Sequence, residues 1–352
     1  MDCATNRYDL HLPHIDQVML GELDLWPWHV VSPMRGLIER QLRQPGKRLR
    51  PRLAMAVADL FGGPARAAYP GAASIEFYHV ASLILDDIQD ASALRHGTQA
   101  LHTIVGTGTA INVAATIRSL SYHTVHHSAL LRPDQKLELH RRLDTAATYL
   151  LLGQSIDVGW QSGWFAEAGE FPYEQMAAWK TGSLFACAAA TAAVACDVPM
   201  RLVDEAEQLG SDFGMLYQLI DDYCDAFDSS GDSALPGDIA EGRPGYPEIV
   251  LRRLESSSGA GCGRAGALLL SQCADSLAGS KRQQQVLDRM ADLDVQRIVR
   301  RHIQDRARQL ISAAKGLGTA TDGIADLVAC VLSLAGMKLA VDDADDETEE
   351  DA

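Results

Sequence analysis

The sequence lacks closely spaced cysteines, long apolar runs and an excess of basic residues. Its seven cysteines are scattered without a CxxC pair, which argues against a disulfide framework or a zinc–thiolate site and favours a reducing cytoplasm. The most apolar C-terminal stretch, residues 327–341, is too short to span a bilayer and contains Lys338. With 31 basic and 47 acidic residues the formal charge is −16, which argues against a nucleic-acid or anionic-membrane partner.

Strand signals are also missing, because the sequence has no alternating β-branched runs flanked by turn residues. What it has is helical periodicity in segments rich in Ala and Leu. The expected helices cover residues 33–44, 50–62, 70–91, 98–127, 134–160, 173–196, 201–227, 246–255, 263–278, 283–315 and 322–340. We therefore predict an all-α fold, a single large helical bundle that is big enough to enclose a cavity.

Departures from this pattern define the ends of the chain and one long loop. Eight of the last eleven residues are acidic, so we expect a solvated tail. Residues 228–245 have no periodicity, and a loop of this length is usually functional; we expect a lid over a bound ligand. Trp26 and Trp28 are expected to pack an N-terminal extension onto the bundle. We predict an extension over residues 1–34, a helical domain over residues 35–341 and a tail over residues 342–352.

Two acidic motifs suggest a metal site. The motif at residues 86–90 (DDIQD) ends an apolar stretch, and helical geometry places His79, Asp86 and Asp90 in one narrow stripe. A single motif of this kind is commonly a solvated helix end. However, a second copy at residues 221–225 (DDYCD) also follows an apolar helix, and buried carboxylates without a cation are very costly. Oxygen ligands without His or Cys favour a hard ion such as Mg²⁺.

Basic residues occur where they could bind phosphate. Residues 40–52 include six basic side chains and no acidic one, in an otherwise acidic chain. Arg95 and His96 follow the first acidic motif, and Lys180 interrupts an apolar Ala-rich helix, where a buried lysine requires an anion. For residues 40–52 a solvated helix-entry cluster remains the alternative, whereas the overall charge disfavours a nucleic-acid patch.

In their order along the chain, these motifs resemble the trans-type prenyl diphosphate synthases, the polyprenyl synthetase family. The matching residues are 46–51, His79, 86–90, 95–97, His102, Gly153, Gln154, Asp157, 180–182, Tyr217, Gln218, 221–225 and 238–247. The resemblance implies a homodimer with the isoprenoid synthase fold and a deep apolar cavity between the two aspartate-rich helices. It also implies that Mg²⁺, with more than one ion per site, helps an allylic diphosphate to ionise, and that isopentenyl diphosphate attacks the cation.

The resemblance also implies roles for single residues. The metal ligands would be Asp86, Asp90 and Asp221, with Asp225 as a further ligand acting directly or through water, and Asp87 and Asp222 in support. The catalytic residues would be Lys180, which grips the allylic diphosphate with Arg95, and Thr181 and Gln218, which face the carbocation together with Tyr217. Isopentenyl diphosphate would be held by Lys47, Arg50, His79 and His96.

Two departures from the family pattern leave other functions open. His96 stands where the family usually has arginine, and the expected lid has no lysine, so Arg243 is its candidate cation. These changes weaken the side of the second substrate. A class I terpene cyclase, or another enzyme that ionises a single diphosphate, therefore stays an alternative, and a non-catalytic partner subunit of a synthase is a second one.

Small residues beside the first motif bear on product length. Ala81 and Ser82 precede Asp86 by about one helical turn, where a growing chain should meet the cavity wall. Because neither is bulky, we expect geranylgeranyl diphosphate as the product, with farnesyl diphosphate second.

Three histidines receive a structural interpretation. His123, His126 and His127 lie close together in the sequence, but no carboxylate or cysteine ligand is near them along the chain. We therefore expect ordinary histidines on a polar helix face.

Overall fold

The computed structural model describes residues 6–95, 97–165, 172–227, 245–257 and 276–338. The acidic tail and nearly all of the expected lid lie outside the described residues, as do His96 and Arg243. The division into extension, helical domain and tail stays a prediction.

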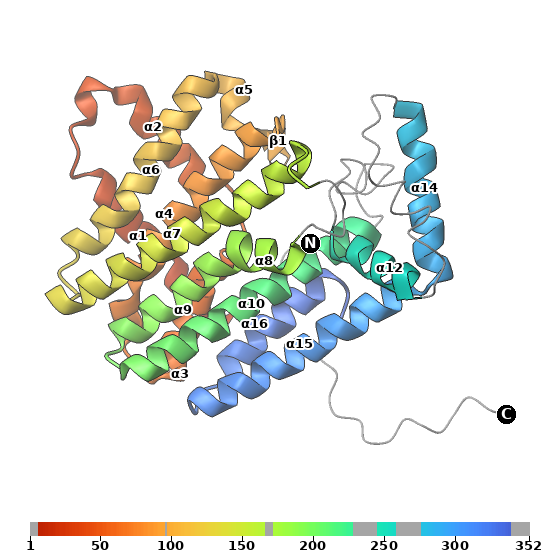
Figure 1. The fold of residues 1–352 in the computed structure, drawn as a ribbon. Helices are drawn as coiled ribbons and strands as arrows, with labels where there is room; N and C mark the ends of the chain where they lie inside the picture. Colours follow the sequence, from red (N-terminus) through yellow and green to blue (C-terminus); the bar gives the residue numbers. More distant parts are fainter. Residues whose placement is uncertain (1–5, 96, 166–171, 228–244, 258–275, 339–352) are drawn as a thin grey trace.

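The all-α fold is confirmed, and most of the described chain forms helices (Figure 1). The elements are η1 (Arg7–His11), α1 (Leu12–Leu23), η2 (Trp28–Val30), α2 (Ser32–Leu42), α3 (Leu49–Leu60), α4 (Ala65–Gln89), α5 (Leu101–Val105), α6 (Thr107–His127), α7 (Pro133–Gln161), α8 (Tyr173–Ala177), η4 (Ala178–Gly182), α9 (Ser183–Ala195), α10 (Met200–Phe227), α12 (Tyr246–Ser257), α14 (Ser276–Asp292), α15 (Val295–Leu317) and α16 (Asp322–Leu334).

Helix α9 forms the centre of the bundle. All 13 of its residues are buried, and it packs against α3, α4, α7 and α10. Its small side chains let neighbouring backbones come close. A Cβ added at Gly210 of α10 would lie 2.4 Å from the carbonyl oxygen of Phe185, and one at Gly214 would lie 2.7 Å from Cα of Gly182. These two glycines therefore hold α10 tightly against α9 and η4.

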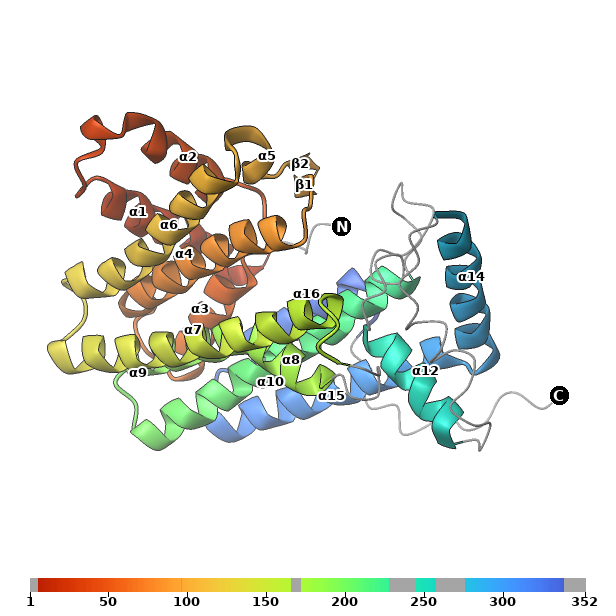
Figure 2. The ribbon, with the colours of Figure 1, turned by 45° about the horizontal axis from the view of Figure 1, so that its top comes forward.

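The acidic motifs lie at the C-terminal ends of α4 and α10. Both helices run in the same general direction, and α7 runs alongside them, so their C-terminal ends lie toward the same end of the bundle (Figures 1 and 2). Segments more than 100 residues apart are thereby brought to one place.

The described residues before α2, 6–31, pack onto the bundle, as expected for the two tryptophans. Met19 and Leu23 of α1 are buried, and α1 contacts α4 and α6. Trp26 and Trp28 are half-buried against the core, and the indole nitrogen of Trp28 donates a hydrogen bond to the carbonyl oxygen of Leu23.

A small hairpin departs from the expectation of no strands. Strands β1 (Leu94–Arg95) and β2 (Thr98–Gln99) pair antiparallel, with Gly97 in the turn at a φ of +73°. The hairpin follows α4 directly and turns Arg95 back toward the first acidic motif.

No described helix is both long and apolar enough to cross a membrane. Cys187, Cys196 and Cys224 carry free thiols. Cys330 is disulfide-bonded, which the cysteine spacing does not predict.

Candidate active site

A cavity of about 460 Å³ lies among the ends of α4, α7 and α10, the start of α3 and η4. Thirteen residues predicted from the sequence line it, namely Lys47, Arg50, His79, Ala81, Ser82, Asp86, Arg95, Lys180, Thr181, Tyr217, Gln218, Asp221 and Asp225. Asp90 terminates α4 and is not among the lining residues. The roles assigned to these residues stay predictions, but the structure brings thirteen of them to one cavity.

Asp86 is the most highly connected carboxylate of the first motif. It accepts hydrogen bonds from Arg95 Nη2 at 3.1 Å and Gln154 Nε2 at 3.0 Å, and Lys180 Nζ lies 3.4 Å away. Burial alone would raise the pKa of Asp86, but the charges of Lys180 and Arg95 outweigh burial and lower it. Asp86 is therefore held as an anion in the cavity.

Its neighbour Asp87 serves a different purpose. The Asp87 side chain is 7% exposed and accepts a hydrogen bond of 2.6 Å from Arg95 Nε. Burial raises the pKa of Asp87, although Arg95 opposes the shift. Asp86 and Asp87 together hold the Arg95 guanidinium beside the first acidic motif, and the predicted support of a metal ion by Asp87 stays a prediction.

Lys180 is held by a partner to which the sequence assigned no separate role. Its Nζ lies 2.5 Å from Asp157 of α7, and the charges of Asp157, Asp86 and Asp90 outweigh burial and raise the pKa of Lys180. Lys180 and Thr181 lie in η4, a single π-helical turn, a feature that often occurs at functional sites. The sequence contains one indication of this contact: Gln154 and Asp157 lie about one helical turn apart on α7, so they face the same side of the helix.

The close approach of α7 and η4 depends on Gly153. A Cβ at this position would lie 2.2 Å from the backbone nitrogen of Lys180 and 2.8 Å from its Cα. Glycine beside Gln154 therefore has a packing role, since any side chain would push η4 away from α7.

In the second motif, Asp222 faces inward. It accepts hydrogen bonds from Tyr173 Oη at 2.6 Å, Gln218 Nε2 at 2.7 Å and the backbone nitrogen of Tyr246 at 2.8 Å. Burial raises its pKa to about 6, against the effect of these bonds. Asp222 therefore joins α8 and the start of α12 to α10, and Asp221 and Asp225 line the cavity.

The orientation of Gln218 follows from these bonds. Its amide nitrogen donates to Asp222, so its oxygen faces Thr181, whose hydroxyl donates to it at 2.5 Å. The two residues predicted to face a carbocation are thus bonded to each other and present oxygen atoms at the cavity wall.

Most of the six basic residues at 40–52 are exposed or form ion pairs within the fold, and are therefore not held ready for a phosphate. Arg40 and Arg43 are exposed. Arg48 is paired with the buried Glu76, and Arg52 with Asp9. The solvated-cluster alternative thus holds for Arg40 and Arg43, and Arg48 and Arg52 form ion pairs within the fold. Lys47 and Arg50 line the cavity, as does the paired Arg48.

Lys47 and Arg50 form a second group of cations, apart from Arg95 and Lys180. Lys47 Nζ donates to Tyr217 Oη at 3.3 Å and lies 5.3 Å from the centre of its ring. Arg50 stacks on the Phe185 ring at 4.4 Å, and its Nη1 lies 3.1 Å from His79 Nε2. Burial lowers the pKa of Arg50, so this site favours an anion that compensates its charge.

The donor set of the cavity suits a hard divalent cation. Asp86, Asp221 and Asp225 offer carboxylate oxygens, which such ions prefer. Among the described lining residues there is no cysteine, and the single histidine, His79, is bonded to Arg50. The negative end of the cavity is therefore built for an oxygen-ligated metal.

Burial of Glu248 predicts that the stability of the fold depends on pH. This residue of α12 is 1% exposed, and burial raises its pKa from 4.5 to about 8, with the charge of Asp222 adding to the shift. A carboxyl group with a raised pKa in the folded state stabilises the fold at low pH, and this contribution is lost as the pH rises through about 8.

We expect Glu248→Gln to raise the free energy of unfolding by about 2 kcal/mol near pH 8.5 and by little near pH 5. Denaturant unfolding of the parent and the variant at both pH values measures this difference in the free energy of unfolding. The control is Glu174→Gln, whose exposed carboxylate is paired with Arg253 and which should gain nothing. An equal gain for Glu248→Gln at both pH values would contradict the prediction.

A helical bundle whose cavity joins two carboxylate motifs to two groups of cations defines a class of enzyme that binds diphosphates with the help of metal ions. Residues 32–260 match the family model described as polyprenyl synthetase. The chain belongs to this family and is a prenyltransferase.

Three known proteins show the range of similarity. A geranylgeranyl pyrophosphate synthase of Eremothecium gossypii is 30% identical over 238 residues, which are 67% of this chain and 74% of that protein. A terpene synthase of Matsumurasca onukii is 32% identical over 219 residues, 59% of this chain and 66% of that protein. A crystal structure of a geranylgeranyl pyrophosphate synthase superimposes with a TM-score of 0.80 at 20% identity, covering 95% of this chain and all of that one. The isoprenoid synthase fold is thereby confirmed.

Proposed function

We propose that this prenyltransferase condenses an allylic diphosphate with isopentenyl diphosphate, head to tail, and that its main product is geranylgeranyl diphosphate. The observation that carries the proposal is the presence of two separate groups of cations in one cavity. Arg95 and Lys180 contact Asp86 of the first acidic motif, whereas Lys47 precedes α3 and Arg50 lies in its first turn. Two diphosphates need two such groups.

Mg²⁺, with more than one ion per site, would be held by Asp86, Asp221 and Asp225, together with Asp90. When bound, it supplies positive charge to the leaving diphosphate. Arg95 and Lys180 add fixed positive charge on the same side and are already oriented by carboxylates, so little reorganisation is needed as charge develops.

Other residues of the cavity stabilise positive charge. The oxygen atoms of Thr181 and Gln218 are fixed by their mutual hydrogen bond and by Asp222, and they face the allylic cation. The Tyr217 ring adds an aromatic face. Lys47, Arg50 and His79 hold isopentenyl diphosphate so that its double bond lies beside this cation, and the loss of a proton completes the reaction.

Product analysis tests the function. The purified protein is incubated with Mg²⁺, isopentenyl diphosphate and each of the C5, C10 and C15 allylic diphosphates, and the dephosphorylated products are separated by chromatography. We expect a C20 alcohol that requires isopentenyl diphosphate. A hydrocarbon formed from one diphosphate alone would support the terpene cyclase alternative, which the similarity to a terpene synthase favours. No turnover would support a partner subunit, against which the two intact acidic motifs argue.

Product length depends on the wall of α4. Ala81 and Ser82 line the cavity about 6–7.5 Å below Asp86 along the helix axis. Below them on α4, Val80, His79 and Tyr78 also line the cavity. Because Ala81 and Ser82 are small, they leave room at this level for a growing chain, which supports a C20 product.

We expect Ala81→Phe and Ser82→Phe each to shift the main product from C20 to C15 or C10, because a phenyl ring would fill the space below the diphosphate site. Ser82 is half-buried, whereas Ala81 is buried, so Ser82→Phe is expected to disturb folding less than Ala81→Phe. Ala81→Ser is the matched control and should leave the product unchanged. Chromatography of the products measures the shift. Unchanged product length in both Phe variants would refute this account.

A homodimer is also proposed. Large apolar side chains are exposed on α5, α6 and α7, namely Ile104, Ile111, Leu137, Tyr149, Leu151 and Leu152. A second copy that covers some of them would remove apolar surface from water. Light scattering after size-exclusion chromatography tests the assembly, and a monomeric mass would contradict it.

We place the enzyme in the cytoplasm, which the free thiols of Cys187, Cys196 and Cys224 support. Fractionation of cells that express the protein tests this location, and recovery in an oxidising compartment would contradict it.

A further inference from the structure

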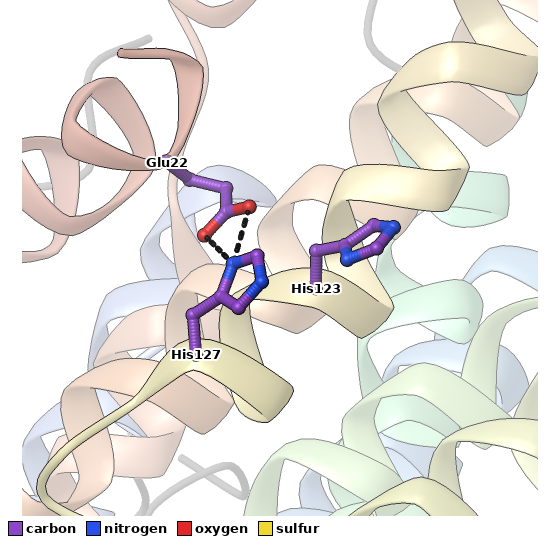
Figure 3. Close-up of side chains that lie close together, drawn as sticks. All are labelled: Glu22, His123 and His127. Atoms are coloured by element: carbon purple, nitrogen blue, oxygen red, sulfur yellow. Dashed lines mark hydrogen bonds and ion pairs between the residues drawn. The ribbon is translucent and has the colours of Figure 1, made fainter. Parts of the chain in front are cut away.

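A group of potential metal ligands lies between α1 and α6, apart from the cavity. Glu22 of α1 and two residues of α6, His123 and His127, each offer a ligand atom, and these atoms all lie within 4.8 Å of one another (Figure 3). None of the three lines the active-site cavity. The sequence interpretation of ordinary histidines rested on the lack of a nearby carboxylate, and the fold supplies one from 105 residues away.

The Glu22 carboxylate is buried and contacts one of the two histidines. The Glu22 side chain is 4% exposed, and His127 Nδ1 lies 3.1 and 3.3 Å from its two oxygens. Trp26 Nε1 donates a further hydrogen bond to it at 3.3 Å. The indole carries no charge, so the charge of the buried carboxylate is compensated on the side of His127, by the imidazole itself or by a cation bound beside it.

The histidines have the spacing that metal sites use. His123 and His127 are four residues apart on α6, so their rings lie on one face of the helix, with centroids 5.3 Å apart. The Trp26 ring packs edge-on against His123 at 4.7 Å, which limits the positions of this imidazole. The His127 side chain is 39% exposed, so the site has access to solvent and room for a water ligand.

We propose that Glu22, His123 and His127 bind a transition-metal ion, Zn²⁺ foremost, which links α1 to the C-terminal end of α6. Two imidazoles and a carboxylate, with water as the fourth ligand, form a common Zn²⁺ donor set. The same set disfavours Mg²⁺, which prefers oxygen ligands. Zn²⁺ binds nitrogen and oxygen ligands at about 2 Å, so binding requires the ligand atoms, which lie within 4.8 Å of one another, to converge further on the ion.

The test uses the full-length protein, stripped of metal with a chelator and kept in excess Mg²⁺ so that the cavity carboxylates are occupied. Zn²⁺ is titrated by calorimetry, and Co²⁺ is added separately as a spectroscopic probe. We expect one Zn²⁺ per chain, visible Co²⁺ absorption typical of a four-coordinate nitrogen and oxygen site, and a higher Tm with Zn²⁺ than without.

Matched variants separate a metal site from a polar contact. Glu22→Gln keeps the size of the side chain, and His123→Ala removes one ring; each should weaken Zn²⁺ binding by about tenfold or more and abolish the rise in Tm. His126→Ala is the control, because His126 neighbours His127 without belonging to the group, and it should bind Zn²⁺ as the parent does. Circular dichroism without metal confirms that each variant is folded.

Three outcomes would overturn the proposal: no Zn²⁺ binding in excess Mg²⁺, equal binding by the parent and folded Glu22→Gln, or an equal loss in His126→Ala.

Discussion

Replacing Asp86 by asparagine is expected to lower kcat/KM for the condensation by about 10³, equivalent to about 4 kcal/mol of transition-state stabilisation. Asparagine preserves the shape of the side chain but removes its charge. The cavity then loses a metal ligand, and Arg95 and Lys180 lose the carboxylate that they share. Steady-state kinetics over a range of Mg²⁺ concentrations measure the effect, and we expect half-maximal activity to require more Mg²⁺.

Asp87→Asn is the matched control, because it makes the same change one residue away. Asp87 contacts Arg95, and its role is to orient that side chain, so we expect a loss of about tenfold and an unchanged Mg²⁺ requirement. Equal losses in the two variants would show that the charge of the motif matters as a whole and that Asp86 has no special role as a ligand.

The sequence predicts the position of Asp86 but not the contact that distinguishes Asp87 from it. Helical spacing predicts that Asp86 faces the same way as His79, and both line the cavity. It does not predict that Arg95 returns to Asp87, because that contact depends on a hairpin of two-residue strands, too short for an alternating pattern. Likewise, the inward orientation of Asp222 depends on Tyr173 and Tyr246, which are remote in the sequence.

The helices themselves were largely predictable. The expected segment 201–227 is α10 to within one residue. Helix α4 begins at Ala65, five residues before the expected start, and Pro70 lies inside it, although proline disfavours a helix interior. The η4 turn was missed for another reason, since one π-helical turn hardly alters the apolar period around it.

Replacing Gly153 by alanine is expected to lower kcat by about 100-fold, although residue 153 carries no catalytic group. The added Cβ would meet the backbone of Lys180 at 2.2 Å and that of Trp179 at 2.8 Å. No side-chain rotation can relieve a clash with backbone, so η4 must move away from α7. Lys180 then shifts relative to Asp157 and Asp86, and a displacement of about 1 Å in a reacting group can cost about 10² in rate. We also expect unfolding to become easier by about 1–3 kcal/mol, as in other overpacked cores.

Gly36→Ala provides the control for the glycine itself. Gly36 lies inside α2, and nothing is within 4 Å of the position where its Cβ would stand. Alanine there should stabilise the protein by about 0.5–1 kcal/mol, because glycine is the poorer helix former, and should leave kcat unchanged. Thermal unfolding measures the change in stability and steady-state kinetics the change in kcat. If Gly153→Ala lowers both stability and kcat, whereas Gly36→Ala raises stability and leaves kcat unchanged, the effect at residue 153 comes from its contact with η4. If Gly153→Ala retained the parent's kcat, the position of Lys180 would not depend on this contact, and the tight packing of α7 against η4 would serve the fold alone.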